Sequence, residues 1–255
     1  MSDLQVDHDG AVSHLRINRP AKRNALNDGL VAELHTAFVN LPQATRAVLL
    51  SGEGEHFCAG LDLSELAERS VAEGMLHSRM WHAAFDQVQF GRVPVVSVLQ
   101  GAVIGGGLEL ACAAHIRVAE PSAYFALPEG QRGIFVGGGG SVRLPRLIGV
   151  ARMTDMMLTG RVYSATEGSA YGFTQYLTEA GGALPKAMEL AERVAANAPL
   201  TNFAVLQALP LIAEANPQTG LLMESLMATV AQSDKEAKRR IRDFLDRKTA
   251  KVKPT

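Results

Sequence analysis

The sequence has few cysteines, no membrane-length apolar run and no excess of either charge. Cys58 and Cys112 are its only cysteines, and their spacing matches neither a disulfide framework nor a zinc site. Glycine, glutamine or charged residues interrupt every apolar stretch well short of a membrane span. Residues 1–4 lack the basic and apolar regions of a signal peptide. We therefore expect a soluble protein of a reducing compartment, the cytoplasm.

The charges nearly cancel. Lysine and arginine number 25, aspartate and glutamate 26, and the formal net charge is −1. No global field favours nucleic acid or an anionic membrane, so we expect neither as a partner. Any phosphate group must be bound by a few local cations.

The 255 residues can form one large domain or two small ones. Apolar patterns predict strands at residues 12–17, 47–50, 93–99 and 116–119, and helices at residues 28–40 and 108–114. Asn27 or Asp28 is expected to cap the first helix. Alternation of strands and helices indicates an α/β layer structure.

The pattern changes after about Gly137. Residues 137–140 are four glycines that predict a turn into a helix at residues 142–148, and residues 153–158 continue in helical composition. We expect no later strand except at residues 176–178. Four further helices are predicted at residues 184–196, 201–213, 221–231 and 234–248. Their apolar content suggests packing on the chain's own core or on a neighbouring subunit.

Two glutamates constrain the chemistry most. Glu109 closes a Gly-Gly-Gly-Leu-Glu sequence that begins at Gly105, and Glu129 closes an Ala-Leu-Pro-Glu sequence. Two carboxyl groups that share one water can act as base and acid on neighbouring carbons. Glycines at a turn that enters a helix let a carbonyl oxygen approach bare N–H groups. The sequence thus predicts a carboxylate pair beside an oxyanion hole.

Three segments together resemble the enoyl-CoA hydratase/isomerase family, the crotonases, and the resemblance covers nearly the whole chain. They are Asn-Arg-Pro-Ala-Lys-Arg-Asn-Ala-Leu-Asn at residues 18–27, His-Phe-Cys-Ala-Gly-Leu-Asp-Leu at residues 56–63, and the glycine-rich stretch 101–110. They occur in the family's order, and residues 158–161 and 244–245 also match. The resemblance implies an α/β fold with a crotonase-like ββα spiral core at residues 1–198. Residues 199–255 would form a C-terminal helical region that joins subunits into a trimer or a dimer of trimers.

The resemblance also assigns the site. The backbone N–H groups of Leu61 and Gly106 would stabilise an enolate-like thioester oxygen. Glu109 and Glu129 match the two glutamates of the hydratases, with Glu109 as the main base toward water and Glu129 as the acid toward C2. The implied reaction is hydration of a trans-2-enoyl-CoA, or the reverse dehydration. No metal or separate cofactor is implied, because coenzyme A is part of the thioester substrate.

Coenzyme A would be held by a small set of residues that the resemblance places near its adenine, phosphates and thioester: Lys22, Arg23, Ala25, Ala59, Leu61, Gly106, Lys248 and Lys251. The sequence departs from the family at Ser64, where many hydratases carry a lysine. It departs again at Val136, where many relatives have a proline before the glycine. The resemblance therefore does not assign one of the phosphate contacts or the shape of the acyl pocket.

Other residues favour ordinary structural roles. Cys58 lacks the partners of a catalytic thiol, so packing is the better interpretation. The histidines at positions 56, 77, 82 and 115 have no metal-ligand spacing. Trp81 and Phe85 recur at helical spacing and fit the core or the wall of a pocket.

Three alternative functions stay open. A Δ3-Δ2 isomerase would use Glu129 alone, and a hydratase-lyase acting on an aromatic enoyl-CoA would release an aldehyde. A member that binds coenzyme A or RNA without turnover would not need both carboxyl groups.

Overall fold

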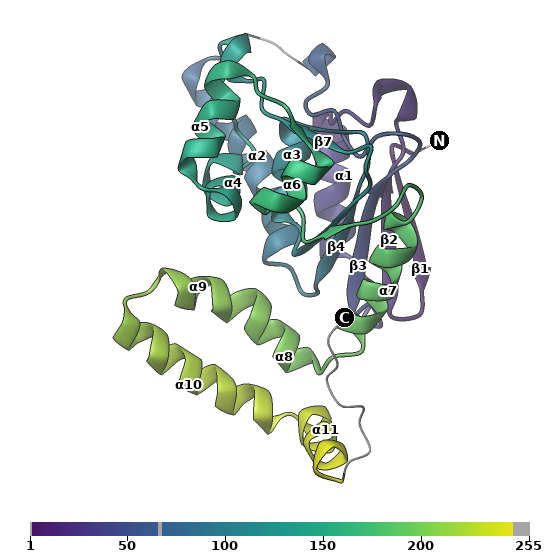
Figure 1. Ribbon diagram of the computed structural model, residues 1–255, viewed down its shortest axis with the longest axis vertical. Helices are drawn as coiled ribbons and strands as arrows, with labels where there is room; N and C mark the ends of the chain where they lie inside the picture. The colour runs from purple at the N-terminus through teal and green to yellow at the C-terminus, as the bar shows by residue number, and fades with distance from the viewer. Residues whose placement is uncertain (1, 66–67, 247–255) are drawn as a thin grey trace. The chain divides into compact units, whose positions relative to one another are not determined.

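The computed structural model describes residues 2–65 and 68–246. The chain divides into two compact units, Met1–Ala195 and Ala196–Thr255 (Figure 1). The first unit holds both sheets and helices α1–α7, and the second is helical in its described residues, 196–246. The described residues form a mixed α/β structure followed by a helical region, as expected from the sequence.

A six-stranded sheet forms the centre of the first unit. Its strands follow the order β1-β2-β3-β4-β6-β9, antiparallel between β1 and β2 and parallel elsewhere. Their bounds are Leu4–Asp9, Val12–Ile17, Ala47–Gly52, Val95–Leu99, Ile116–Ala119 and Tyr176–Leu177. The predicted strands at residues 12–17, 47–50 and 116–119 are confirmed, and the one predicted from residue 93 begins at Val95.

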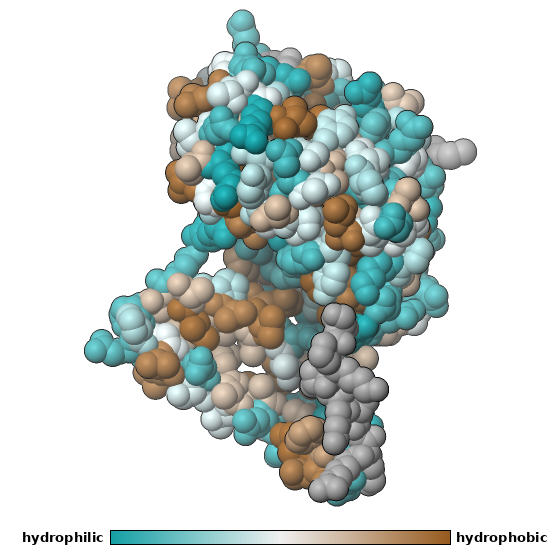
Figure 2. All heavy atoms as spheres, viewed as in Figure 1, coloured by the Kyte–Doolittle hydropathy of each residue, from teal (hydrophilic) through white to brown (hydrophobic). Residues whose placement is uncertain are grey.

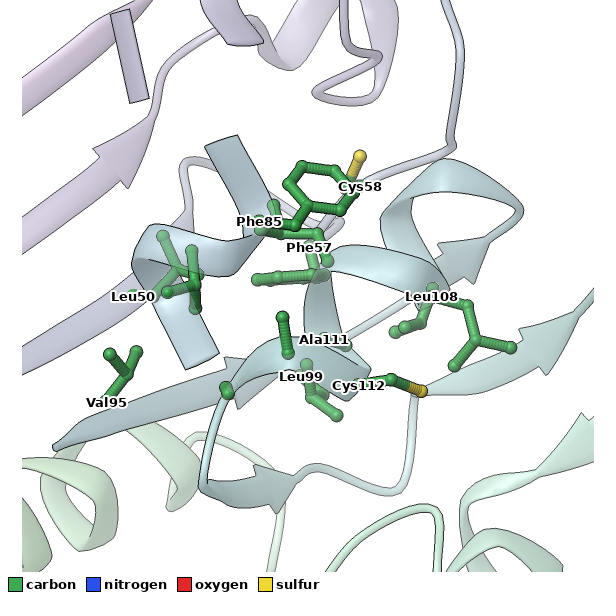
Figure 3. Close-up of a cluster of buried hydrophobic side chains, with 14 of the residues drawn as sticks. Leu50, Phe57, Cys58, Phe85, Val95, Leu99, Leu108, Ala111 and Cys112 are labelled. Atoms are coloured by element: carbon green, nitrogen blue, oxygen red, sulfur yellow. The ribbon is translucent and has the colours of Figure 1, made fainter. Parts of the chain in front are cut away.

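Side chains that alternate along the strands pack against helices on both faces of this sheet. Leu49, Val96 and Val98 contact the buried side of α7 (Ala183–Ala195). Val48 and Leu50 point the other way, toward α1 (Asp28–Val39), α2 (Val71–Gln89) and α3 (Gly106–Ala113). Figure 3 shows Phe57 and Phe85 packed around Ala111 of α3. Because α3 is buried along its whole length, the residues of its first turn are held rigidly.

Caps explain where the first two helices begin. The Asn27 side chain accepts a hydrogen bond of 2.7 Å from the Leu30 N–H at the start of α1, which confirms one of the two expected caps. Ser70 and Glu73 form a reciprocal capping box at the start of α2.

A three-stranded sheet lies in the same unit, in the order β5-β7-β8. These strands are Ala102–Ile104, Tyr124–Ala126 and Tyr163–Ser164. The expectation that no strand follows Gly137 except at residues 176–178 is wrong for β8, whose two residues leave almost no periodic signal. Helix α6 (Ala165–Tyr171) packs against β7 and β8 of this sheet, α4 (Gly140–Ile148) packs against α3, and α5 (Val150–Thr159) packs against α4.

The described part of the second unit is helical. Its elements are α8 (Pro199–Phe203), a π-helical turn (Ala204–Ala208), α9 (Leu209–Glu214), α10 (Pro217–Ser233) and α11 (Lys235–Leu245). α10 packs against each of the other four. The helix predicted at residues 221–231 is confirmed, and the one predicted at residues 234–248 is confirmed as far as Leu245, with residues 247 and 248 outside the described part. The helix predicted at residues 201–213 is divided by the π turn. Many large apolar side chains of this unit are exposed (Figure 2).

A search of the helices within residues 2–65 and 68–246 finds none that is both long enough and apolar enough to cross a bilayer.

Candidate active site

A cavity of about 390 Å³ opens in the first unit beside α2 and the start of α3. The four residues predicted to be catalytic, Leu61, Gly106, Glu109 and Glu129, all line it. They come from three segments of the chain, because Gly106 and Glu109 both belong to α3. The structure therefore brings the four predicted residues together around one cavity.

Glu109 lies in the first turn of α3 and is 4% exposed. Its Oε1 accepts hydrogen bonds from the backbone N–H groups of Gly138 at 2.9 Å and Gly140 at 2.7 Å. Burial raises the pKa of the Glu109 carboxyl, whereas these two amides and the nearby charge of Arg143 lower it. Burial is the larger effect, so the pKa of Glu109 lies above its usual value, and the two amides and Arg143 limit the rise.

Glu129 has different surroundings in the same cavity. It follows β7 and Pro128 and is 8% exposed. Its Oε2 has no hydrogen-bond partner among the described residues. Burial, together with the charge of Glu109, raises the pKa of this carboxyl to about 7. An unpaired buried oxygen with a raised pKa suits a carboxyl that holds a proton at neutral pH.

Leu61 is held so that its amide faces the cavity end of α3. On one side, the Leu26 N–H donates to Gly60 O and the Asp62 N–H donates to Leu26 O, both at 2.7 Å. A Cβ atom built on Gly106 would lie 3.7 Å from the Leu61 nitrogen. Within residues 2–65 and 68–246, neither the Leu61 N–H nor the Gly106 N–H donates a hydrogen bond. Two neighbouring free amides of this kind can stabilise an oxyanion.

Glycine is required around these amides for steric reasons. Gly60 has φ +92°, and a Cβ there would lie 2.8 Å from Ile104 O. At Gly105, with φ +53°, a Cβ would lie 2.5 Å from Glu129 Oε1, and at Gly106 it would lie 2.8 Å from the Trp81 ring. The close approach of backbone, carboxyl and indole therefore depends on missing side chains.

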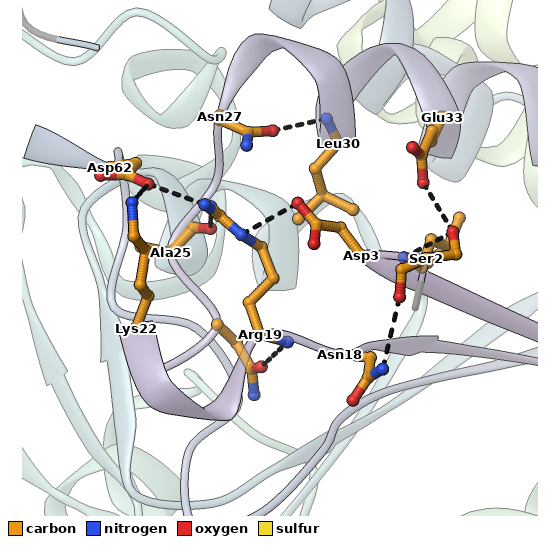
Figure 4. A network of polar contacts seen from close by, with 12 residues as sticks. Ser2, Asp3, Asn18, Arg19, Lys22, Ala25, Asn27, Leu30, Glu33 and Asp62 are labelled. Carbon is orange, nitrogen blue, oxygen red and sulfur yellow. Dashed lines mark hydrogen bonds and ion pairs between the residues drawn. The ribbon is translucent and has the colours of Figure 1, made fainter. Parts of the chain in front are cut away.

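The predicted cations of the first motif lie on a loop that is joined by ion pairs to Asp62, the residue that follows Leu61. Lys22 Nζ and Arg19 Nη2 bind the same oxygen of Asp62, at 2.8 Å and 2.9 Å (Figure 4). These partners, together with Ser64, hold the pKa of Asp62 well below its usual range. Lys22 is half exposed, so a phosphate can reach it only in competition with Asp62.

The other predicted contacts of coenzyme A lie in and beside this loop. Arg23 is exposed and adopts the left-handed conformation, with φ 51°, and its carbonyl accepts from the Ala59 N–H at 3.0 Å. Ala25 is buried and its carbonyl accepts from Arg19. Ser64 donates to Asp62 through both its N–H and its hydroxyl group. Lys248 and Lys251 lie outside the described residues.

The residues given ordinary roles behave as expected with one refinement. Cys58 is fully buried and burial raises its pKa to about 12, so it is a packing residue. Trp81 lines the cavity, whereas Phe85 lies in the core behind Gly138. Within the described ranges 2–65 and 68–246, no group of three or more His, Cys, Asp or Glu side chains is arranged to hold a metal.

The sequence indicated only an ordinary structural role for His77 and did not single out Ser78 or Arg143. His77 and Ser78 line the cavity from α2, where His77 binds Asp28 at 2.7 Å and Ser78 donates to Gly137 O at 2.6 Å. Arg143 does not line the cavity, but it donates a hydrogen bond to Gly138, which does. A helical pattern cannot distinguish it from the nearby Arg146, although Arg143 is buried and Arg146 exposed. The glycines 137–140 do form the predicted turn into α4, but their role in holding Glu109 was not predicted.

Comparisons with known proteins agree with this arrangement. Residues 7–254 match the family model for enoyl-CoA hydratase/isomerase. The chain is 32% identical to 2,3-dehydroadipyl-CoA hydratase of Escherichia coli K12, over 99% of each chain. A solved structure from Rhodopseudomonas palustris CGA009 is 72% identical, with a TM-score of 0.94 over 98% of this chain and 97% of that one. An enoyl-CoA hydratase from Bacillus anthracis is 32% identical, with a TM-score of 0.90 over 96% of this chain and 97% of that one.

Proposed function

The chain belongs to the enoyl-CoA hydratase/isomerase family, whose members act on acyl-CoA substrates, and we propose that it is a hydratase. It would add water across the double bond of a trans-2-enoyl-CoA to give a 3-hydroxyacyl-CoA, or catalyse the reverse dehydration. The observation that carries this proposal is the contrast between Glu109 and Glu129. Two buried carboxyl groups face one cavity: Glu109 accepts two backbone hydrogen bonds, which favour its ionised form, whereas Glu129 has an oxygen without a partner among the described residues and a pKa raised to about 7.

In the proposed mechanism, Glu109 takes a proton from a water as the water oxygen bonds to C3 of the substrate. The C2–C3 π electrons move toward the thioester, whose oxygen becomes negative beneath the Leu61 and Gly106 amides. Glu129 then gives its proton to C2. The pair ends with the proton on Glu109 instead of Glu129, so one water is added and the total number of protons on the pair is unchanged.

The proposed substrate position uses the rest of the site. The thioester would lie between the two amides, and the nucleotide part would extend along the exposed loop of Lys22 and Arg23, with Ala25 and Ala59 offering backbone contacts. In this proposal, Lys248 and Lys251 of a neighbouring subunit would contact a phosphate group of coenzyme A. No separate cofactor is used in it.

We also propose that the protein forms a homotrimer or a dimer of trimers through the second unit. Support comes from the apolar side chains that its helices leave exposed. Leu221, Leu222 and Leu226 of α10 are all more than half exposed, as are Phe244 and Leu245 of α11. Surfaces of this kind usually mark protein contacts.

The pH dependence of hydration tests the proposal. We expect kcat/KM to follow a bell-shaped curve whose alkaline side falls through about pH 7, because the active pair must keep the proton of Glu129. The acidic side falls when Glu109 becomes protonated. Because hydration and dehydration need the same total number of protons on the pair, the curve should be the same in both directions.

The measurement is the initial rate of loss or gain of the conjugated thioester absorbance across a pH series. In Glu129→Gln, the residual activity should lack the alkaline limb. An alkaline limb that persists in this variant would contradict the assignment of Glu129 as the proton donor.

The two enzymatic alternatives predict other products. A Δ3-Δ2 isomerase returns a product of unchanged mass and needs a single base. A hydratase-lyase acting on an aromatic enoyl-CoA releases an aldehyde. Both make less use of the observed pair, since the two backbone hydrogen bonds to Glu109 and the raised pKa of Glu129 together fit the addition of water.

A further inference from the structure

We propose that Arg143 is a positioning residue that holds the glycine turn against Glu109 and so keeps the catalytic base in place. The inference rests on the proposed function, in which Glu109 is the base. Arg143 itself does not line the cavity and would not touch the substrate.

Arg143 joins the glycine turn to α2. Its side chain is 7% exposed, and all three guanidinium nitrogens have partners. Nη1 donates to Gly138 O at 2.9 Å, Nη2 to Asp86 Oδ1 at 2.6 Å and Nε to Gln89 Oε1 at 2.6 Å. Asp86 and Gln89 both belong to α2, so the planar guanidinium group fixes the turn to a rigid helix.

The carbonyl that Arg143 binds lies between the two amides that bind Glu109. Gly138 N–H and Gly140 N–H donate to Glu109, and the Gly138 C=O belongs to the peptide group between them. Gly139 has φ +96°, and a Cβ there would lie 2.2 Å from Arg143 Nη1. Four consecutive glycines have many accessible conformations, so the turn needs an external contact to keep both amides aimed at one oxygen.

The positive charge of Arg143, like its hydrogen bonds, supports Glu109 in the role of base. The charged groups around Glu109 are Arg143 from α4 and Glu129 from the loop after β7, with the half-exposed Asp86 of α2 behind Arg143. The positive charge favours the ionised form of Glu109, as do the two amides. Loss of Arg143 should therefore raise the pKa of Glu109 and weaken its alignment with the attacking water.

Three variants test this inference. Arg143→Met removes both the charge and the hydrogen bonds, Arg143→Lys keeps the charge but cannot serve all three partners, and Arg146→Met is the control. Arg146 is exposed on the same helix and lies outside the cavity. We expect Arg143→Met to lower kcat by about tenfold to a hundredfold with little change in KM, because small misplacements of a catalytic group cost up to about this much. The acidic limb of the pH profile should move to higher pH in Arg143→Met and less in Arg143→Lys.

A second measurement does not depend on turnover. The Glu109 carboxyl can be titrated by carbon NMR in protein labelled at glutamate, with Glu109→Gln used to assign its signal. A higher pKa in Arg143→Met than in wild type and Arg146→Met supports the inference, and identical titrations overturn it. If Arg143→Met does not fold by circular dichroism, Arg143→Lys decides: wild-type kcat in that variant overturns the inference, and a lowered kcat supports it. If the wild type hydrates no enoyl-CoA, the proposed function fails, while the titration still tests the contact.

Discussion

Replacement of Glu109 by glutamine should lower kcat for hydration by about 10²-fold to 10⁴-fold, the usual contribution of a general base. The change removes the basic oxygen and little else. A glutamine amide oxygen can still accept the hydrogen bonds that Gly138 and Gly140 donate to Oε1. KM should therefore stay close to the wild-type value, because the contacts of the thioester are unaffected.

Steady-state rates on a short-chain 2-enoyl-CoA measure this effect, and Glu192→Gln is the matched control. Glu192 is exposed on α7, which covers the face of the main sheet opposite to α1, α2 and α3. We expect its rates to equal those of the wild type. Full activity in Glu109→Gln, with loss only in Glu129→Gln, would instead support an isomerase with one base.

Replacement of Gly60 by alanine should lower kcat by about 10²-fold to 10³-fold, as expected when an oxyanion-hole donor is displaced. The new Cβ would lie 2.8 Å from Ile104 O and 3.3 Å from Gly106 N. Both neighbours are backbone atoms and cannot rotate away. Relief of the clash must separate the Leu61 segment from the start of α3, and so the two amides would no longer point to one oxygen.

Gly149→Ala is the control for backbone strain. Gly149 has φ +85°, similar to Gly60, but a Cβ there meets nothing within 4 Å. Both variants should lose about 1–2 kcal/mol of stability from the positive φ, measured by urea unfolding, while Gly149→Ala keeps its activity. A folded Gly60→Ala with near-normal kcat would show that these amides do not form the oxyanion hole.

Local sequence patterns predicted the buried elements of the fold well. The β3 strand reads as a continuous apolar run because it is buried along almost its whole length, and α1 shows helical periodicity because it has one apolar face and a clear cap. The edge strand β1 was missed, since most of its residues are exposed and its apolar content is low. Helix α2 was not delimited for a related reason: its buried residues Trp81, Ala84, Phe85 and Val88 all lie in its second half.

The site was predicted by motif and completed by the structure. The segments that carry Leu61, Gly106, Glu109 and Glu129 were chosen on sequence, and the structure places them around one cavity. Their different protonation behaviour could not be predicted, because it depends on which oxygens find partners in three dimensions. The hydrogen bonds from Gly138 and Gly140 to Glu109 connect segments 29 and 31 residues apart, and no local pattern records such a contact.

The most direct test of the hydratase proposal is the fate of water oxygen. The wild-type protein would be incubated with a short-chain 2-enoyl-CoA in water labelled with heavy oxygen, and the products analysed by mass spectrometry. We predict a CoA thioester whose mass increases by one labelled water, with the label on C3 and with almost no product from Glu109→Gln. An unlabelled product of unchanged mass, a released aldehyde or no reaction with any 2-enoyl-CoA would contradict the proposal.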